Sequence, residues 1–150
     1  GKFKSYIGYN EFPKRISEKD GFIFYWDPEA QAPYAYNAME KVYATFDDKK
    51  SIEAKTKYVI KNKFLSSEEL NFIAAANELE QLHVCWGAKE SLFKLYGKGS
   101  LPFIDGIKIA NFEYGKTAEI AASIAIPAYH ANFNVQYLKY EDFMLTWVME

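Results

Sequence analysis

The sequence predicts an α+β protein in which helices pack on a mostly antiparallel sheet. Two patterns carry this prediction. Short apolar runs with alternating side chains lie near both ends of the chain, as expected for strands that bury one face. Between them, apolar residues recur at helical spacing and are bounded by capping residues and glycines.

The first strands are expected at residues 22–26 and 41–46. The run 22–26 is apolar and is enclosed by Gly21 and the Asp27-Pro28 pair, which are typical turn residues. Residues 41–46 alternate apolar side chains with tyrosine and threonine, as one buried and one exposed face require. Tyr34 and Tyr36 alternate in the same way between these two runs.

The first helix is expected at residues 51–63. Its apolar residues form a broken stripe, and lysines cover the opposite face. Asp47 or Asp48 could cap its start, because a carboxylate oxygen accepts hydrogen bonds from the free amides of a first turn.

Two further helices are expected over residues 67–80 and 83–96. Ser66 and Glu69 have the spacing of a capping box, in which each side chain satisfies a backbone donor of the other residue. Gly97 follows the last apolar residue of the second pattern and is expected to end that helix.

The closing part of the chain is expected to add strands at residues 107–112, 132–138 and 143–148. Lys139–Asp142 suits the loop of a hairpin between the last two. Residues 117–126 fit either a helix or a strand, since their isoleucines have helical spacing but stand before a proline.

Composition excludes several classes of protein. Of the 150 residues 49% are hydrophobic, and the net charge is −2. Residues 1–64 carry 12 basic against 9 acidic side chains and residues 65–150 carry 6 against 11. Neither balance suits a nucleic-acid partner. No apolar run is long enough to span a membrane. The single cysteine, Cys85, cannot form an internal disulfide, so a cytoplasmic location is expected.

The candidate site lies in the run Trp86–Lys94. Glu90 and Lys94 are four residues apart and project from one helix face, with Lys89 on the flank of that line. A carboxylate beside two ammonium groups can hold a divalent cation and the phosphates that the cation neutralises. The alternative is a solvent-exposed Glu–Lys pair without further function.

The chain resembles the 4′-phosphopantetheinyl transferases over about residues 62–149. The motifs that carry the resemblance are Phe64-Leu65-Ser66-Ser67-Glu68-Glu69, Trp86-Gly87-Ala88-Lys89-Glu90-Ser91, Lys94, Gly97-Lys98-Gly99 and the closing hairpin. The resemblance implies a half-domain of that family in the C-terminal part. It also implies Mg²⁺-dependent transfer of 4′-phosphopantetheine from coenzyme A to a serine of an acyl or peptidyl carrier protein.

The resemblance also implies roles for single residues. Glu90 would be a catalytic residue and a Mg²⁺ ligand, Lys94 a catalytic phosphate contact, and Lys89 a second cation that binds coenzyme A. Further Mg²⁺ ligands come, in that family, from a Gly-x-Asp-x-Glu type strand. The matching spacing falls on residues 46–50, so Asp47 and Asp48 are the expected metal ligands, although the glycine and the second acid of the pattern are absent. Short members assemble as trimers, so a homo-oligomer is one expectation.

Residues 22–63 resemble the late barrel region of family 18 glycoside hydrolases, the chitinase family. The matching blocks are Phe24–Asp27, Ala30–Asn37, Phe46–Ile52 and Lys55–Val59. The catalytic Asp-x-x-Asp-x-Asp-x-Glu strand of that family is absent from the sequence, so no acid is present to protonate a glycosidic oxygen. The resemblance therefore implies a glycan-binding fragment, with Trp26, Tyr34 and Tyr36 lining a groove.

Together the two resemblances predict a hybrid chain. Residues 1–63 would form a chitinase-like α/β segment, and residues 64–150 a phosphopantetheinyl-transferase-like α+β segment. Three functions stay open: the transferase, a non-catalytic hybrid in which transfer has been lost, and the glycan-binding fragment.

Overall fold

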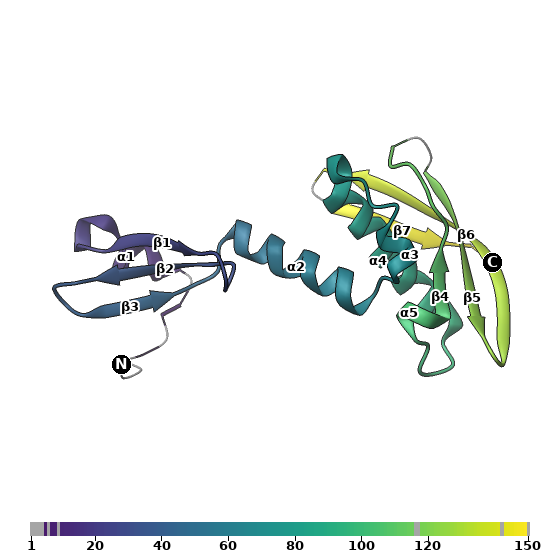
Figure 1. The fold of residues 1–150 in the computed structure, drawn as a ribbon, viewed down its shortest axis with the longest axis horizontal. Coiled ribbons are helices and arrows are strands. Elements are labelled where there is room, and N and C mark those ends of the chain that lie inside the picture. Colours follow the sequence, from purple (N-terminus) through teal and green to yellow (C-terminus); the bar gives the residue numbers. More distant parts are fainter. Residues whose placement is uncertain (1–4, 6, 9, 116–117, 142, 150) are drawn as a thin grey trace. The chain divides into compact units, whose positions relative to one another are not determined.

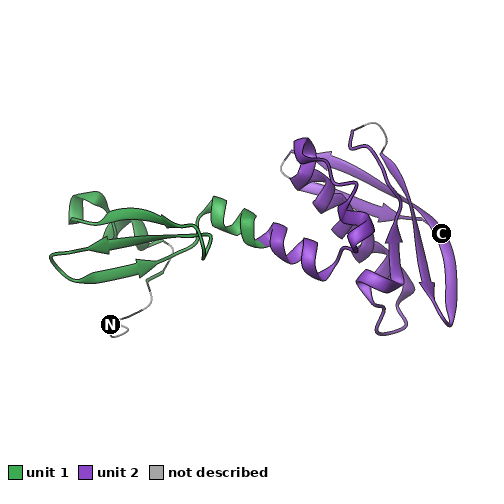
Figure 2. Cartoon of the chain, in the orientation of Figure 1, with its two compact units in different colours: residues 1–55 green, residues 56–150 purple. Residues whose placement is uncertain are grey.

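The chain folds into two compact units, residues 1–55 and 56–150 (Figures 1 and 2). The computed structural model describes residues 5, 7–8, 10–115, 118–141 and 143–149. The boundary between the units lies inside helix α2 (Lys49–Lys63). A domain boundary after residue 63, as the two resemblances imply, stays a prediction.

The prediction of an α+β fold with antiparallel strands is confirmed, but the expected single sheet is wrong. Two separate antiparallel sheets are present, one of three strands and one of four. The reason is that the strands before α2 are short and close on their nearest neighbours through tight turns, so they complete a sheet of their own.

Unit 1 is built on the three-stranded sheet β1 (Ile23–Asp27), β2 (Ala32–Asn37) and β3 (Val42–Thr45), in that order. The short helix α1 (Phe12–Arg15) precedes it. A small core forms on one face of the sheet from Ile16, Phe22 and Ala35, with Phe12, Val42 and Phe46 packed around them.

Helix α2 begins with a reciprocal cap. The Ser51 amide donates to Asp48 Oδ1 at 2.8 Å, and the Asp48 amide donates to Ser51 Oγ at 2.8 Å. The expectation that one of the two aspartates caps this helix is therefore confirmed, and the capping residue is Asp48.

The last part of α2 belongs to unit 2 and is held there by packing and charge. Ile60 is buried in the core of unit 2. Lys57 lies 3.1 Å from Glu78 Oε2, and Lys61 donates to Glu78 Oε1. These ammonium groups, Lys61 first, hold the pKa of Glu78 below its ordinary value of 4.5.

We expect the stabilisation from Glu78 to be present at neutral pH and to disappear in acid. Because the pKa of Glu78 is lowered in the folded state, this stabilisation is complete above pH 4.5 and is lost as the pH falls through the folded-state pKa. The partly exposed network contributes about 0.5–1 kcal/mol. The unfolding temperatures of wild type and Glu78→Gln should therefore differ at pH 7, and the difference should shrink as the pH falls below 4.5. A difference that stays constant on acidification would contradict this assignment.

Unit 2 places helices on one face of a four-stranded sheet. Its strands, in the order β4-β5-β6-β7, are β4 (Ile107–Ile109), β5 (Glu119–Ile126), β6 (Tyr129–Tyr140) and β7 (Phe143–Val148). Its helices are α3 (Ser67–Leu70), α4 (Glu78–Tyr96) and α5 (Phe103–Gly106). Figure 1 shows α4 lying across the sheet.

The core of unit 2 forms between α4 and the sheet. Leu82, Ala88 and Leu92 of the helix and Ile107 and Ile124 of the sheet are completely buried. The helix ends at Gly97, which has a left-handed backbone with φ of 59° and whose amide donates to the Phe93 carbonyl, so the expected stop is confirmed.

The predicted helix over 67–80 is wrong after its first turn. The capping box of Ser66 and Glu69 forms, but α3 ends at Leu70. The Ala74 amide donates to the side chain of Gln81 at 2.7 Å instead of to a helical carbonyl, so the chain turns here and α4 begins at Glu78. Helix α4 consequently includes residues that were assigned to the earlier helix.

The ambiguous segment 117–126 is a strand from Glu119 onward, and Thr117 lies outside the described residues. The predicted hairpin loop is also shorter than expected. Lys139 and Tyr140 still belong to β6, and Asp142 lies outside the described residues.

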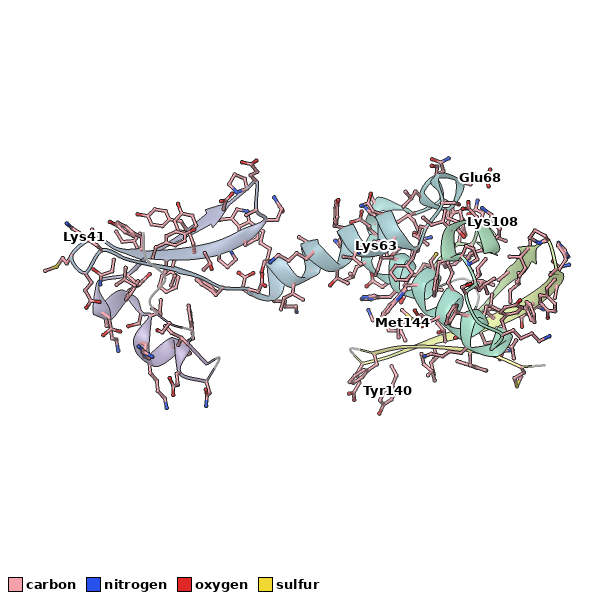
Figure 3. All side chains as sticks on the ribbon, turned by 90° about the horizontal axis from the view of Figure 1, so that it is seen from below. Lys41, Lys63, Glu68, Lys108, Tyr140 and Met144 are labelled. Atoms are coloured by element: carbon pink, nitrogen blue, oxygen red, sulfur yellow. The ribbon has the colours of Figure 1, made fainter. Side chains whose placement is uncertain are left out.

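The outer face of the β6–β7 hairpin is apolar and exposed. Leu138 pairs with Leu145, and Tyr140 pairs with Phe143, so the four side chains share one face of the sheet. All four are more than half exposed, and Figure 3 shows Tyr140 at the end of the hairpin. The expected homo-oligomer stays a prediction. No helix in the described part of the chain has both the length and the apolar character needed to cross a membrane.

Candidate functional site

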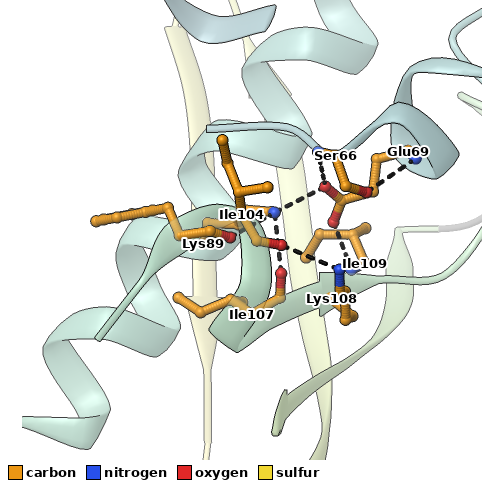
Figure 4. A network of polar contacts seen from close by, with 8 residues as sticks. Ser66, Glu69, Lys89, Ile104, Ile107, Lys108 and Ile109 are labelled. Carbon is orange, nitrogen blue, oxygen red and sulfur yellow. Dashed lines mark hydrogen bonds and ion pairs between the residues drawn. The ribbon is translucent and has the colours of Figure 1, made fainter. Parts of the chain in front are cut away.

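Lys89, expected on the surface of α4, is completely buried. Its Nζ donates to Glu69 Oε2 at 2.7 Å, to the Phe103 carbonyl at 2.8 Å and to the Ile107 carbonyl at 2.9 Å (Figure 4). An ammonium group has three N–H donors, and all three are used. Lys89 therefore has no donor left for a phosphate, and its expected position on the exposed flank of the site is corrected. Burial lowers the pKa of Lys89, and the Glu69 carboxylate opposes that shift.

Glu69, the partner of Lys89, is only 2% exposed. Its Oε2 accepts from the Ser66 amide at 2.7 Å as well as from Lys89, and its Oε1 accepts from the Ile109 amide at 2.9 Å. One carboxylate therefore links the start of α3, the middle of α4 and strand β4. The capping box was readable from the sequence, but nothing in the sequence marked Glu69 as the partner of a lysine 20 positions later.

Glu90 and Lys94 lie on the accessible side of α4. Glu90 is partly buried and Lys94 is exposed. Within the described residues no ion pair joins them, and no other described side chain is bonded to either. The lone Glu–Lys pair of the alternative interpretation is therefore not formed, and a carboxylate and an ammonium are left facing solvent on one helix face.

A close approach between α4 and β7 holds this part of the helix. A Cβ atom added to Gly87 would lie 2.6 Å from Thr146 Oγ1 and 2.8 Å from its Cγ2. One turn later, Ser91 Oγ lies 3.1 Å from Thr146 Oγ1 and 3.2 Å from the Thr146 carbonyl. The sequence motif contains Gly87, but only the structure assigns it this packing role.

Replacing Gly87 with alanine is expected to destabilise unit 2 or displace α4. Overpacking of this kind costs about 1–3 kcal/mol, and the better helix propensity of alanine returns about 1 kcal/mol. Urea denaturation of the full chain measures the net loss. The control is Thr146→Ala, alone and combined with Gly87→Ala, since removing the threonine side chain relieves the contact. If Gly87→Ala were more stable than wild type, this packing role would be wrong.

The two expected metal ligands of unit 1 are already engaged. Asp48 Oδ1 caps α2, and Asp47 Oδ1 accepts from Ser51 Oγ at 2.9 Å and from Lys55 Nζ at 2.5 Å. The Lys55 ammonium, followed by the Ser51 hydroxyl, lowers the pKa of Asp47. Both side chains are exposed, and no described residue bonds to the second carboxylate oxygen of either.

The expected metal site combines residues of both units, because Asp47 and Asp48 belong to unit 1 and Glu90 to unit 2. In the described parts of the chain, no three histidine, cysteine, aspartate or glutamate side chains form a group that could hold a metal ion. A site shared by these three carboxylates stays a prediction.

Cys85 is a buried residue of the core and not a nucleophile. It is completely buried, and burial, followed by the Glu69 carboxylate, raises the pKa of its thiol to about 12. A thiol of this kind carries almost no thiolate at neutral pH.

The predicted glycan groove in unit 1 is wrong. Trp26 pairs with Pro33 while Tyr34 pairs with Tyr25, so the tryptophan lies on the opposite face of the sheet from Tyr34 and Tyr36. The Tyr34 ring is also stacked on Tyr25 at 5.0 Å between centroids, with 17° between the ring planes. One face of this ring is therefore covered by another tyrosine.

Residues 46–148 match the family model of the 4′-phosphopantetheinyl transferase superfamily. The match covers more than half of the sequence, so the chain belongs to this superfamily. It begins at Phe46 and includes Asp47, Asp48 and all of α2. The match is wider than the expected segment 62–149, and confinement of the half-domain to the C-terminal part stays a prediction.

Chitinase A1 of Niallia circulans is 45% identical over 41 residues, which are 27% of this chain and 6% of the chitinase. The chain thus spans a small fraction of that relative, and the hybrid origin stays a prediction. No solved structure matches the chain.

Proposed function

We propose that the chain carries out Mg²⁺-dependent transfer of 4′-phosphopantetheine from coenzyme A to a serine of an acyl or peptidyl carrier protein. The observation that carries the proposal is the pair of unbonded, oppositely charged side chains, Glu90 and Lys94, on the accessible face of α4 in a member of this superfamily. Family membership supports phosphopantetheine transfer in general, and the metal, the donor and the acceptor are part of the proposal.

The Glu90 carboxylate is a donor of the kind that Mg²⁺ prefers. This ion is usually held by one or two carboxylates, several waters and the phosphates of a substrate. Glu90 would supply one carboxylate of this set. When bound, Mg²⁺ would supply positive charge that polarises the phosphates of coenzyme A.

The residues of the chain have distinct tasks in the reaction. The serine hydroxyl oxygen bonds to the phosphorus that bears pantetheine, and the bond from that phosphorus to the bridging oxygen breaks, releasing adenosine 3′,5′-bisphosphate. Glu90 takes the serine proton, directly or through water. The Lys94 ammonium stabilises the negative charge that develops on the leaving oxygen. Lys89, with its donors used inside the core, supports the helix that carries both residues.

Mass spectrometry of a carrier protein tests the proposal. We expect an apo carrier protein incubated with the full chain, coenzyme A and Mg²⁺ to gain phosphopantetheine on one serine, and chelation of the metal to stop the reaction. Calorimetric titration of coenzyme A with Mg²⁺ tests binding alone. Absence of both heat and modification at millimolar coenzyme A would favour the non-catalytic hybrid instead.

A further inference from the structure

The ion pair between Glu69 and Lys89 lies in an unusual place, the interior of unit 2. Lys89 is 0% exposed and is among the largest fully buried side chains of the described chain. Taking two charges out of water is costly, and apolar residues of similar size usually stabilise a core as well or better. Stability alone therefore does not explain why this ion pair lies in the core.

The contacts of the pair fix one particular quantity, the rotation of α4 about its axis. Lys89 leaves the middle of the helix and is bound at three points, by Glu69 from α3, by the Phe103 carbonyl of α5 and by the Ile107 carbonyl of β4. These acceptors are in turn held by neighbouring elements, since Glu69 also accepts from the Ser66 and Ile109 amides. A small rotation of α4 would break several of these bonds at once.

Glu90 follows Lys89 directly, so the same rotation sets where the Glu90 carboxylate points. One residue corresponds to about 100° around a helix of 3.6 residues per turn. Lys94 lies one turn further along the same face as Glu90. With Lys89 fixed in the core, both side chains leave the helix in a defined direction.

We propose that Glu69 and Lys89 are positioning residues whose buried pair orients α4, so that Glu90 and Lys94 face the phosphates of coenzyme A and the metal. The consequence for the reaction rests on the proposed function, whereas the orientation of α4 does not.

The test compares the wild-type chain with the double variant Glu69→Gln/Lys89→Met, which removes both charges but keeps approximate shape and leaves no buried charge unpaired. The nuclear Overhauser effect between the Gly87 Hα protons and the Thr146 methyl group reports the rotation of α4 in the free protein, because these groups are in close contact in the wild type. We expect this effect to change while the spectrum stays that of a folded protein. We expect coenzyme A binding with Mg²⁺ to weaken about 10–100-fold, and kcat to fall more than KM changes.

Lys108→Met is the matched control. Lys108 also donates to a carbonyl of α5, that of Ile104, at 3.1 Å, but it projects from β4, and no hydrogen bond or ion pair joins it to a described residue of α4 (Figure 4). We expect this variant to keep both the Gly87–Thr146 effect and the affinity for coenzyme A.

Each outcome decides the inference. An unchanged Gly87–Thr146 effect in the folded double variant overturns it, as does a changed effect with unchanged binding and kcat. If the effect changes and the wild type itself fails to bind coenzyme A, the orientation of α4 by the pair is upheld and the proposed function falls.

Discussion

Replacing Glu90 with glutamine is expected to lower kcat for phosphopantetheine transfer by about 10²–10³-fold. Glutamine keeps the shape of the side chain but removes the charge that would bind Mg²⁺ and the oxygen that would take the serine proton. Since Glu90 is only partly buried and has no bonded partner among the described residues, we expect the melting temperature to stay within about 2 °C of wild type. Steady-state kinetics with a carrier protein measures the loss.

Glu68→Gln is the matched control for this change. Glu68 is an exposed glutamate of α3 in the same unit (Figure 3). Its variant should transfer phosphopantetheine at the wild-type rate. Wild-type kcat in Glu90→Gln would remove Glu90 from the reaction, even if the chain proves to be a transferase.

Replacing Lys89 alone with methionine is expected to lower the free energy of unfolding by about 3–5 kcal/mol. Methionine fills similar space but leaves the Glu69 carboxylate buried without its counter-ion, and leaves the Phe103 and Ile107 carbonyls without their donor. Uncompensated buried charge is among the most costly defects in a protein core. Urea denaturation of the full chain provides the measurement.

The double variant Glu69→Gln/Lys89→Met separates charge from packing. If Lys89→Met is destabilising because the Glu69 carboxylate is left without its counter-ion, neutralising Glu69 as well should recover much of the lost stability. A single variant as stable as wild type would show that Lys89 is not needed to compensate Glu69, and the buried network would then lack the energetic role assigned to it.

Local patterns predicted most of the elements. An apolar run between turn residues located β1, alternation of side chains located β3, and the aspartates before Ser51 correctly marked the start of α2. These signals depend only on residues that are close together in the sequence. The end of the helix after Leu70 was missed because it depends on Gln81. The side chain of this residue, in the next helix, accepts a hydrogen bond from the Ala74 amide. The division into two sheets was missed for a related reason, since no local pattern states which strands pair.

The candidate site was predictable only in part. Spacing placed Glu90 and Lys94 on one helix face, where the structure has them. The same spacing placed Lys89 near the surface, because a lysine in an amphipathic pattern is normally exposed. Its three acceptors come from Glu69, Phe103 and Ile107, which are distant in sequence, so only the folded chain reveals them. Likewise, the pairing of Trp26 with Pro33 determines on which face of the sheet the tryptophan lies. The sequence pattern did not predict which residues pair.

The position of Trp26 makes the two units separately observable. Its ring lies in unit 1, with Lys50 Nζ 3.8 Å from the ring centroid, whereas Trp86 and Trp147 belong to unit 2. A chain in which Trp86 and Trp147 are phenylalanine would emit tryptophan fluorescence from unit 1 alone. Comparing its melting curve with that of a chain lacking only Trp26 would show whether unit 1 unfolds at a lower temperature than unit 2.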